Sequence, residues 1–365
     1  MLAKGNAIVY NIPNCIKRGT KMYENLGIDL GASRIVLGAP EGGIIASEAV
    51  PAQSWGKGES PMELGRVASQ RITGRGGEAA RCRVMGERPL VSDVTSDIIK
   101  NMLRSHGAAG GSSVLMGIPC RFSEMEENAL TEMALSAGAR DAYLVYTPIA
   151  AMVGNDLDLG MGAVVVDIGA TRTNILITCR GRIFCKRTIA VGGVNFDYAI
   201  ADYILKKYKV EITPDVAEAV KMKVGTVWVE NERRTAEAHG RDVTNGDYCS
   251  AHISSDEMFA ALEDPMAVLM EGICDAITKI PPDYVREVFD TGILLSGGGS
   301  LLDGIDLMIS GVTGINTVRM NDPENTTVRG LAVLAARAAA VAGTGTRNIS
   351  RYIMKAAAEP RGGKV

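Results

Sequence analysis

Two aspartates stand where a strand-like apolar run meets a short glycine turn. Asp29 lies in GIDLGAS, two residues before Gly31, and Asp167 lies in VVVDIGA, two residues before Gly169. A tight turn that contains glycine exposes consecutive backbone N–H groups, which can hold phosphate oxygens. A carboxylate beside the turn would repel phosphate directly, but it can hold a hydrated Mg²⁺ that bridges the phosphates. The repeat predicts two hairpins that grip a nucleotide's phosphates from both sides, although either one alone would also fit an ordinary surface turn.

A third glycine turn has the composition to hold the nucleoside. The stretch TGILLSGGGSLLDG, residues 291–304, runs from an apolar strand into Gly297, Gly298 and Gly299, and we expect Ser300 to cap the next helix. Three glycines leave bare backbone against which a flat ring can lie. A flexible loop is the alternative, but the apolar runs on both sides favour an ordered turn.

These turns, in this order, resemble those of the actin, sugar kinase and heat-shock chaperone superfamily, and within it the bacterial actins of the MreB family. The resemblance covers residues 26–340 approximately, and its most specific part is SGGGSLLDG with the apolar helix after it. Other stretches that carry it are GIDLGAS, LTEMALSAGARDAYLV, VVVDIGATRTNILI, VGGVNFDYAIADYILKKYKVEI and AEAVKMKVG. It implies an α/β fold of two actin-like, ribonuclease H-like domains, whose mixed sheets flank a cleft for ATP and Mg²⁺.

The resemblance also assigns a role to each turn. Asp29 and Asp167 would hold the metal through water and position the attacking water. The other cofactor-binding positions belong to the two phosphate turns, the glycine before the next helix, a pair near the ribose and adenine, and the third turn: Gly31, Ala32, Ser33, Arg34, Gly169, Ala170, Thr171, Arg172, Gly193, Glu218, Lys221, Gly297, Gly298, Gly299 and Ser300.

Several of these residues have a second interpretation. The N–H groups of the turn after Asp167 suit phosphate only if its non-glycine residues avoid positive φ. Arg172 can reach a phosphate, although a place in solvent is favoured, and Arg34 is more ambiguous. Glu218 and Lys221 lie three residues apart on one helical face, so an ordinary surface ion pair would give the same spacing.

The residue before Pro148 departs from the family pattern. Relatives place an acidic residue there, which orients the water that attacks the terminal phosphate, whereas this chain has Thr147. A hydroxyl can hydrogen-bond a water, but it cannot carry the negative charge that polarises it. An alignment shifted by one residue would place Tyr146 there, with the same outcome. Hydrolysis is therefore predicted to be slow or to rely on another group, with Thr147 kept as a catalytic candidate.

Composition argues against several other classes of protein. The 365 residues are 46% hydrophobic and 22% charged with a net charge of −3, which suits two soluble domains and gives no electrostatic reason to bind nucleic acid. Seven cysteines without a CxxC pair, and three histidines, fit reduced thiols in a cytoplasm rather than disulfides or zinc. No apolar run is long enough to cross a bilayer. Attachment to the inner face of the membrane, common in the family, is put in doubt by the small side chains at 106–113.

The order of the predicted elements gives a domain plan. Residues 1–22 match nothing downstream and are expected to be a disordered extension or a mis-called start. Domain I is expected to take residues 23–157 and 328–343, and domain II residues 158–327, with 344–365 as a flexible tail. We also expect a helix over 92–104, a hairpin through Asn245-Gly246, helices before and after Pro265, a strand over 313–320 and a final helix over 328–343.

The resemblance predicts ATP-dependent assembly of this protein with itself, into filaments that scaffold cell shape or position an intracellular structure. A non-hydrolysing paralogue that co-assembles with another bacterial actin is one alternative, and a reactivase or chaperone-like ATPase is a second. A small-molecule kinase would need a catalytic base and larger inserted subdomains, which the sequence lacks. A membrane or membrane-protein anchor stays open as a further partner.

Overall fold

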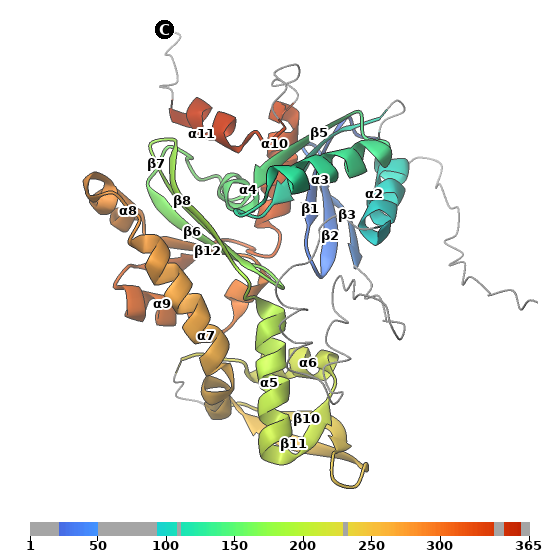
Figure 1. Cartoon of the computed structure of the whole chain (residues 1–365), viewed down its shortest axis with the longest axis vertical. Coiled ribbons are helices and arrows are strands. Elements are labelled where there is room, and N and C mark those ends of the chain that lie inside the picture. The colour runs from blue at the N-terminus through green and yellow to red at the C-terminus, as the bar shows by residue number, and fades with distance from the viewer. Residues whose placement is uncertain (1–21, 50–92, 108–110, 229–232, 339–346, 359–365) are drawn as a thin grey trace, which may run out of the picture.

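The computed structural model describes residues 22–49, 93–107, 111–228, 233–338 and 347–358. Within them lie two five-stranded sheets and one three-stranded sheet (Figure 1). The predictions for residues 1–21, for most of the glycine-rich region before residue 92 and for part of the 106–113 loop fall outside the described residues. The two larger sheets belong to two α/β domains, and we call the boundary along which these domains meet the seam.

The first sheet carries the first Asp-Gly hairpin. Its strand order is β3-β2-β1-β4-β5, in which β1 is antiparallel to β2 and parallel to β4. The strands are β1 (Asn25–Leu30), β2 (Arg34–Ala39), β3 (Gly43–Ala49), β4 (Ser113–Ile118) and β5 (Asp141–Tyr146). The helices of this domain are α2 (Asp93–His106), α3 (Glu124–Ser136), α4 (Thr147–Gly154) and α10 (Thr326–Ala338). The helix expected over 92–104 is therefore confirmed as α2.

The second sheet carries the second hairpin, and its central strands are buried on both faces. Its order is β13-β12-β6-β7-β8, and its strands are β6 (Ala163–Ile168), β7 (Thr173–Cys179), β8 (Arg182–Ile189), β12 (Ile293–Ser296) and β13 (Thr317–Arg319). Val165 packs into the core shared with the first domain, while Val164 and Val166 pack into the core of the second. A continuous apolar run is what a strand covered on both sides requires.

The remaining elements cover the second sheet and extend it outward. The helices are α5 (Gly193–Tyr208), α6 (Pro214–Val224), α7 (Ser255–Ile277), α8 (Val285–Thr291) and α9 (Ile305–Thr313), with short 3₁₀ turns η2 (Pro282–Tyr284) and η3 (Gly298–Leu301). The small sheet has the order β11-β10-β9, from β9 (Val210–Ile212), β10 (Thr235–Asp242) and β11 (Tyr248–Ser254). The hairpin through Asn245-Gly246 is confirmed, with Gly246 in the left-handed region at φ 81°.

Three predicted boundaries are wrong. No helix begins at Ser300: its hydroxyl donates back to the Gly297 carbonyl (2.6 Å), residues 298–301 form the η3 turn, and α9 starts only at Ile305. The helix does not stop at Pro265, which lies inside the single helix α7 because buried side chains on both sides keep that helix packed. The strand expected over 313–320 starts only at Thr317, because α9 continues to Thr313.

Helices α4 and α10 make backbone contact, which fixes the start of α4 at the seam. A methyl group at Gly330 would lie 1.7 Å from the Ala150 carbonyl oxygen, and one at Gly154 would lie 1.9 Å from the Thr326 carbonyl oxygen. Only glycine fits at either position, since real Cβ atoms do not approach so closely. The packing of the final small-residue helix onto the first domain is therefore confirmed.

The end of the chain differs from the expected flexible tail. Residues 350–358 form α11 (Ser350–Ala358), which packs against β8 and β5 (Figure 1). Ile349, Ile353 and Met354 of this segment are buried. Ile353 and Met354 follow Ile349 by four and five residues, a spacing that indicates one buried side of a packed helix.

Candidate functional site

The two aspartates of the glycine hairpins come together at the seam. Asp29 lies near the end of β1 and Asp167 near the end of β6, in different domains. Burial and the charge of Asp167 raise the pKa of Asp29 to about 7, while the Arg34 guanidinium lowers it by a smaller amount. Burial and the neighbouring carboxylate both disfavour the negative charge of Asp29, and a bound cation would offset both effects.

Hydrogen bonds from both domains hold Asp167. Its carboxylate accepts from the Thr147 hydroxyl (2.7 Å), at the first residue of α4, and from the Ser296 hydroxyl (3.1 Å), at the end of β12. Burial raises the pKa of Asp167, and these hydrogen bonds oppose that rise. Ser296 was not predicted, although it stands directly opposite Asp167 in the β12–β6 pairing and directly before the three glycines.

Asn174 of β7 is a second residue that the sequence analysis missed. Its amide donates to the Thr147 hydroxyl (3.2 Å) and accepts from the Cys120 N–H (3.1 Å) and the Thr188 hydroxyl (2.8 Å). It lies opposite Asp167 in the β6–β7 hairpin. An amide side chain at that cross-strand position, in a fully buried strand, is the signal that the sequence offers. Asn174 therefore links the carboxylate site to the end of β4 in the other domain.

Thr147 is the predicted residue whose position the structure makes most informative. Its hydroxyl donates to Asp167 and accepts from Asn174, so its only proton is already used. The neighbouring candidate, Tyr146, points its hydroxyl at Lys186 of β8, which donates to it at 2.7 Å. Neither residue supplies a carboxylate at this position.

The turn after Asp167 keeps the backbone that phosphate binding requires. The Gly169 N–H donates to the Arg172 carbonyl (2.9 Å), and none of residues 170–172 has positive φ. The Thr171 hydroxyl oxygen is buried and has no hydrogen-bond partner within the described residues. An orphaned buried oxygen of this kind fits a turn whose polar partner is a ligand. The Arg172 side chain is half-buried rather than fully in solvent.

Gly193 lies beside this turn but uses its N–H there. The Gly193 and Val194 N–H groups, at the start of α5, donate to the Gly169 and Ala170 carbonyls (3.0 and 2.7 Å). These donors therefore orient the phosphate turn and are not available to a phosphate in this arrangement. A direct role for the Gly193 N–H stays a prediction.

Lys221 of α6 reaches the same region. Its ammonium forms an ion pair with Asp197 (2.7 Å) in α5 and donates to the Gly193 carbonyl (3.1 Å). The side chains of Lys221 and Asp197 are only 17% and 9% exposed, so this is not an ordinary surface ion pair. Lys221 ties α6 to the start of α5, and Glu218 lies one turn earlier on α6, half-buried. Their contact with a nucleoside stays a prediction.

The three glycines pack directly on the end of β6. Gly297 has φ 80°, and a methyl group there would lie 2.3 Å from the Ile168 carbonyl oxygen and 2.9 Å from an Asp167 carboxylate oxygen. A methyl group at Gly299 would lie 2.3 Å from the Ile168 side chain. Gly298 between them is exposed. The turn therefore presents bare backbone next to the carboxylate site, as an adenosine-binding role requires.

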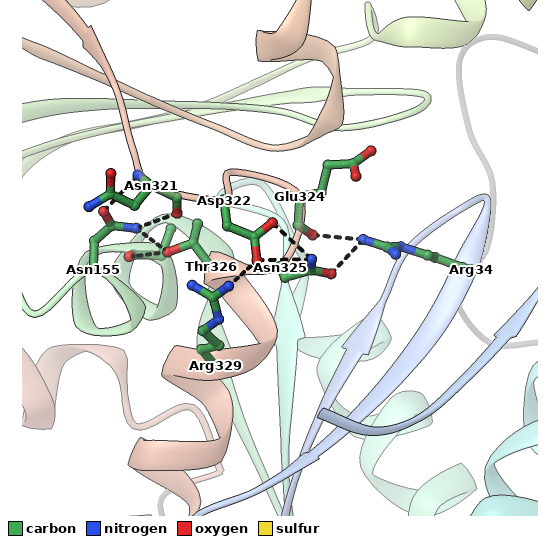
Figure 2. A network of polar contacts seen from close by, with 9 residues as sticks. Arg34, Asn155, Asn321, Asp322, Glu324, Asn325, Thr326 and Arg329 are labelled. Atoms are coloured by element: carbon green, nitrogen blue, oxygen red, sulfur yellow. Dashed lines mark hydrogen bonds and ion pairs between the residues drawn. The ribbon is translucent and has the colours of Figure 1, made fainter. Parts of the chain in front are cut away.

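Arg34 connects the first hairpin to the segment that enters α10, as Figure 2 shows. Its guanidinium donates to the Glu324 carbonyl and to the Asn325 side chain, both at 2.9 Å. The same segment also bonds the three-glycine turn, because the Gly297 N–H donates to the Pro323 carbonyl (2.8 Å). The Arg34 side chain thus has a structural partner, and its backbone, with Gly31, Ala32 and Ser33, remains the candidate for phosphate.

Asn155 lies in the link that joins the domains after α4, and it bonds the segment before α10. Its amide bonds the backbone of Asn321 and the Thr326 hydroxyl (Figure 2). The two links, after α4 and before α10, are therefore bonded to each other beside the site.

The residues present fit Mg²⁺ with ATP. The described residues contain no cluster of three or more His, Cys, Asp or Glu that could enclose a metal. Asp29 and Asp167 alone fit an ion that keeps most of its waters and takes its remaining ligands from phosphates. The glycine turns on both sides of these carboxylates would hold those phosphates through backbone N–H groups.

Solved structures share this architecture. MreB5 of Spiroplasma citri bound to ADP matches with a TM-score of 0.73 and 24% identity, over 86% of this chain and 96% of that chain. The MamK double helical filament matches with a TM-score of 0.65 and 22% identity, over 85% and 98%. Two mixed-sheet domains with facing Asp-Gly hairpins therefore define an actin-like protein, as the sequence predicted.

The family follows from the sequence comparisons. The family model for MreB/Mbl protein matches residues 23–342. Cell shape-determining protein MreB of Escherichia coli K12 is 28% identical over 86% of this chain and 94% of its own length. Cell shape-determining protein Mbl of Bacillus subtilis 168 is 28% identical over 78% and 88%. The chain belongs to the MreB/Mbl family. None of its described helices is both long and apolar enough to span a membrane.

Proposed function

We propose that this protein binds Mg-ATP at the seam and assembles with itself into cytoplasmic filaments that scaffold cell shape or position an intracellular structure. The observation that carries the proposal is the Asp29–Asp167 pair, flanked by two glycine hairpins and the three-glycine turn. Relatives named as cell shape-determining proteins and a MamK filament of the same fold support it. The domains proposed are residues 23–157 with 328–343, and 158–327.

Slow hydrolysis is part of the same proposal. Thr147 stands where a carboxylate would polarise water, and its proton is committed to Asp167. A weak ATPase that accompanies assembly is therefore favoured over a fast one. The same observation favours a second candidate, a non-hydrolysing paralogue that binds ATP and co-assembles with another bacterial actin.

High-speed pelleting of the purified protein tests the proposal. The protein is incubated with Mg-ATP, Mg-ADP or no nucleotide, the pellet is examined by negative-stain microscopy, and phosphate release is followed in parallel. Filaments that require ATP and persist, with little phosphate released, are the expected result. A protein that binds ATP but stays monomeric in every condition would contradict self-assembly and favour a co-assembling paralogue or a reactivase-like ATPase.

A further inference from the structure

Residues 347–350 form hydrogen bonds with β5, the edge strand of the first sheet. The Leu144 N–H of β5 donates to the Arg347 carbonyl, and the Ile349 N–H donates back to the Leu144 carbonyl, both at 2.9 Å. The Ser350 hydroxyl accepts from the Tyr146 N–H at 3.0 Å. The segment therefore pairs like a short strand and then begins α11 directly beside the residue that precedes Thr147.

The same helix also reaches the second domain. α11 packs against β8 as well as β5, and Ile183 of β8 packs on the apolar cluster that contains Ile353 and Met354. At its other end, the Ala357 carbonyl lies 3.6 Å from the position of a methyl group on Gly160, in the link between α4 and β6. One short helix thus touches both domains and the link between them.

Tyr146 makes this bridge relevant to the site. The Tyr146 N–H donates to the Ser350 hydroxyl at the start of α11, and Lys186 of the second domain donates to the Tyr146 hydroxyl. The next residue, Thr147, bonds Asp167 across the seam. If the domains rotated apart around their links, contacts of α11 with β8, and those of Tyr146 and Thr147, would have to break together.

We propose that α11 is a clasp across the seam, which slows opening of the two domains and the release of bound nucleotide. The part concerning nucleotide rests on the proposed function, whereas the bridging of the domains does not. The helix lies beyond residue 342, where the match to the family model ends. The device therefore belongs to the C-terminal segment of this chain and not to the matched family region.

Two measurements on the full chain test the clasp. Met354→Asp places a charge at a position that is 1% exposed and should detach α11, while Tyr352→Asp changes a residue of the same helix that is 50% exposed and serves as the control. Dissociation of a fluorescent ATP analogue is measured by stopped flow with Mg²⁺. Amide hydrogen exchange of β8 and of residues 155–162 is measured without nucleotide.

In Met354→Asp, the nucleotide analogue should dissociate about tenfold faster, which is the change expected when the contacts of about one buried side chain are lost. Amide exchange should also be faster in β8 and in residues 155–162. Tyr352→Asp should match the wild type. Ser350→Ala, which removes one hydrogen bond without burying charge, should shift both readouts in the same direction by less, and it keeps the test decisive if Met354→Asp does not fold.

Detachment of α11 without any change in β8, in residues 155–162 or in dissociation would overturn the clasp. If the wild type fails to bind nucleotide in an equilibrium titration, the proposed function fails. The exchange measurement then still decides whether α11 bridges the domains.

Discussion

The raised pKa of Asp29 predicts a pH dependence of stability that one substitution should remove. The pKa is about 7 in the folded protein, against an ordinary aspartate value of 3.8. The folded state therefore binds more protons than the unfolded state between these pH values. The contribution of Asp29 to the free energy of unfolding is therefore greatest below the lower value and falls as the pH rises toward 7. The difference of about three pH units corresponds to about 4 kcal/mol at most, and to less because Asp29 keeps some solvent exposure.

Urea unfolding in metal-free buffer between pH 5 and 8 measures this contribution. Relative to the wild type, Asp29→Asn should flatten the fall in the free energy of unfolding by about 2 to 3 kcal/mol, because it removes a carboxylate whose charge is disfavoured first by burial and then by Asp167. The variant should be the more stable protein at pH 8 without metal. Mg-ATP should stabilise the wild type far more than the variant, since only the wild type retains both carboxylates.

A matched control separates this effect from general charge loss. Asp264→Asn removes an exposed carboxylate of α7 and should give a profile parallel to that of the wild type. If Asp29→Asn also runs parallel to the wild type, the Asp29 carboxyl does not titrate with the raised pKa that its burial and the Asp167 charge give it. The seam would then lack the electrostatic property that suits it to a cation.

Three other substitutions test the site and its support. Thr147→Glu should raise ATP-dependent phosphate release about 100-fold by supplying a carboxylate, while Thr147→Ser stays slow; equal rates would contradict the role given to this position. Asn174→Ala should cost about 2 kcal/mol in urea unfolding, because the Cys120 N–H and the proton of the Thr188 hydroxyl lose their acceptor. Gly330→Ala should cost about 3 kcal/mol or more, because its methyl would overlap the Ala150 carbonyl oxygen. Val333→Ala, at an exposed site of the same helix, should stay within about 0.5 kcal/mol of the wild type.

The sequence predicted the fold well where local pattern and tertiary environment agree. Both Asp-Gly hairpins, the hairpin through Asn245-Gly246 and the small-residue helix α10 appear as expected. Each has a local cause: close backbone approach at Gly31, positive φ at Gly246, apolar runs in β6 and β7, and small residues in α10.

The errors arise where contacts distant in sequence decide. Ser300 has the chemistry of a helix cap, but the turn it belongs to is pressed against Ile168 and closes on itself. Pro265 interrupts no helix because buried residues on both sides hold α7 together. Local propensity carries no information about either contact.

The candidate site shows the same limit. The glycines and aspartates could be found because their spacing repeats. Ser296 and Asn174 could not be ranked without the strand register that places both opposite Asp167. The partner of Lys221 likewise depends on how α6 packs against α5, which places Asp197 within reach.

The pairing of residues 347–349 with β5 has a further consequence for solubility. β5 is the outermost strand of its sheet, and an uncovered edge of apolar residues is a template on which another chain can add a strand. Here the outward N–H and carbonyl of Leu144 are already bonded to the chain's own end. Proteolytic loss of that end would expose an aggregation-prone edge. In the intact protein, another chain cannot extend the sheet through the backbone groups of Leu144, because these groups are already bonded.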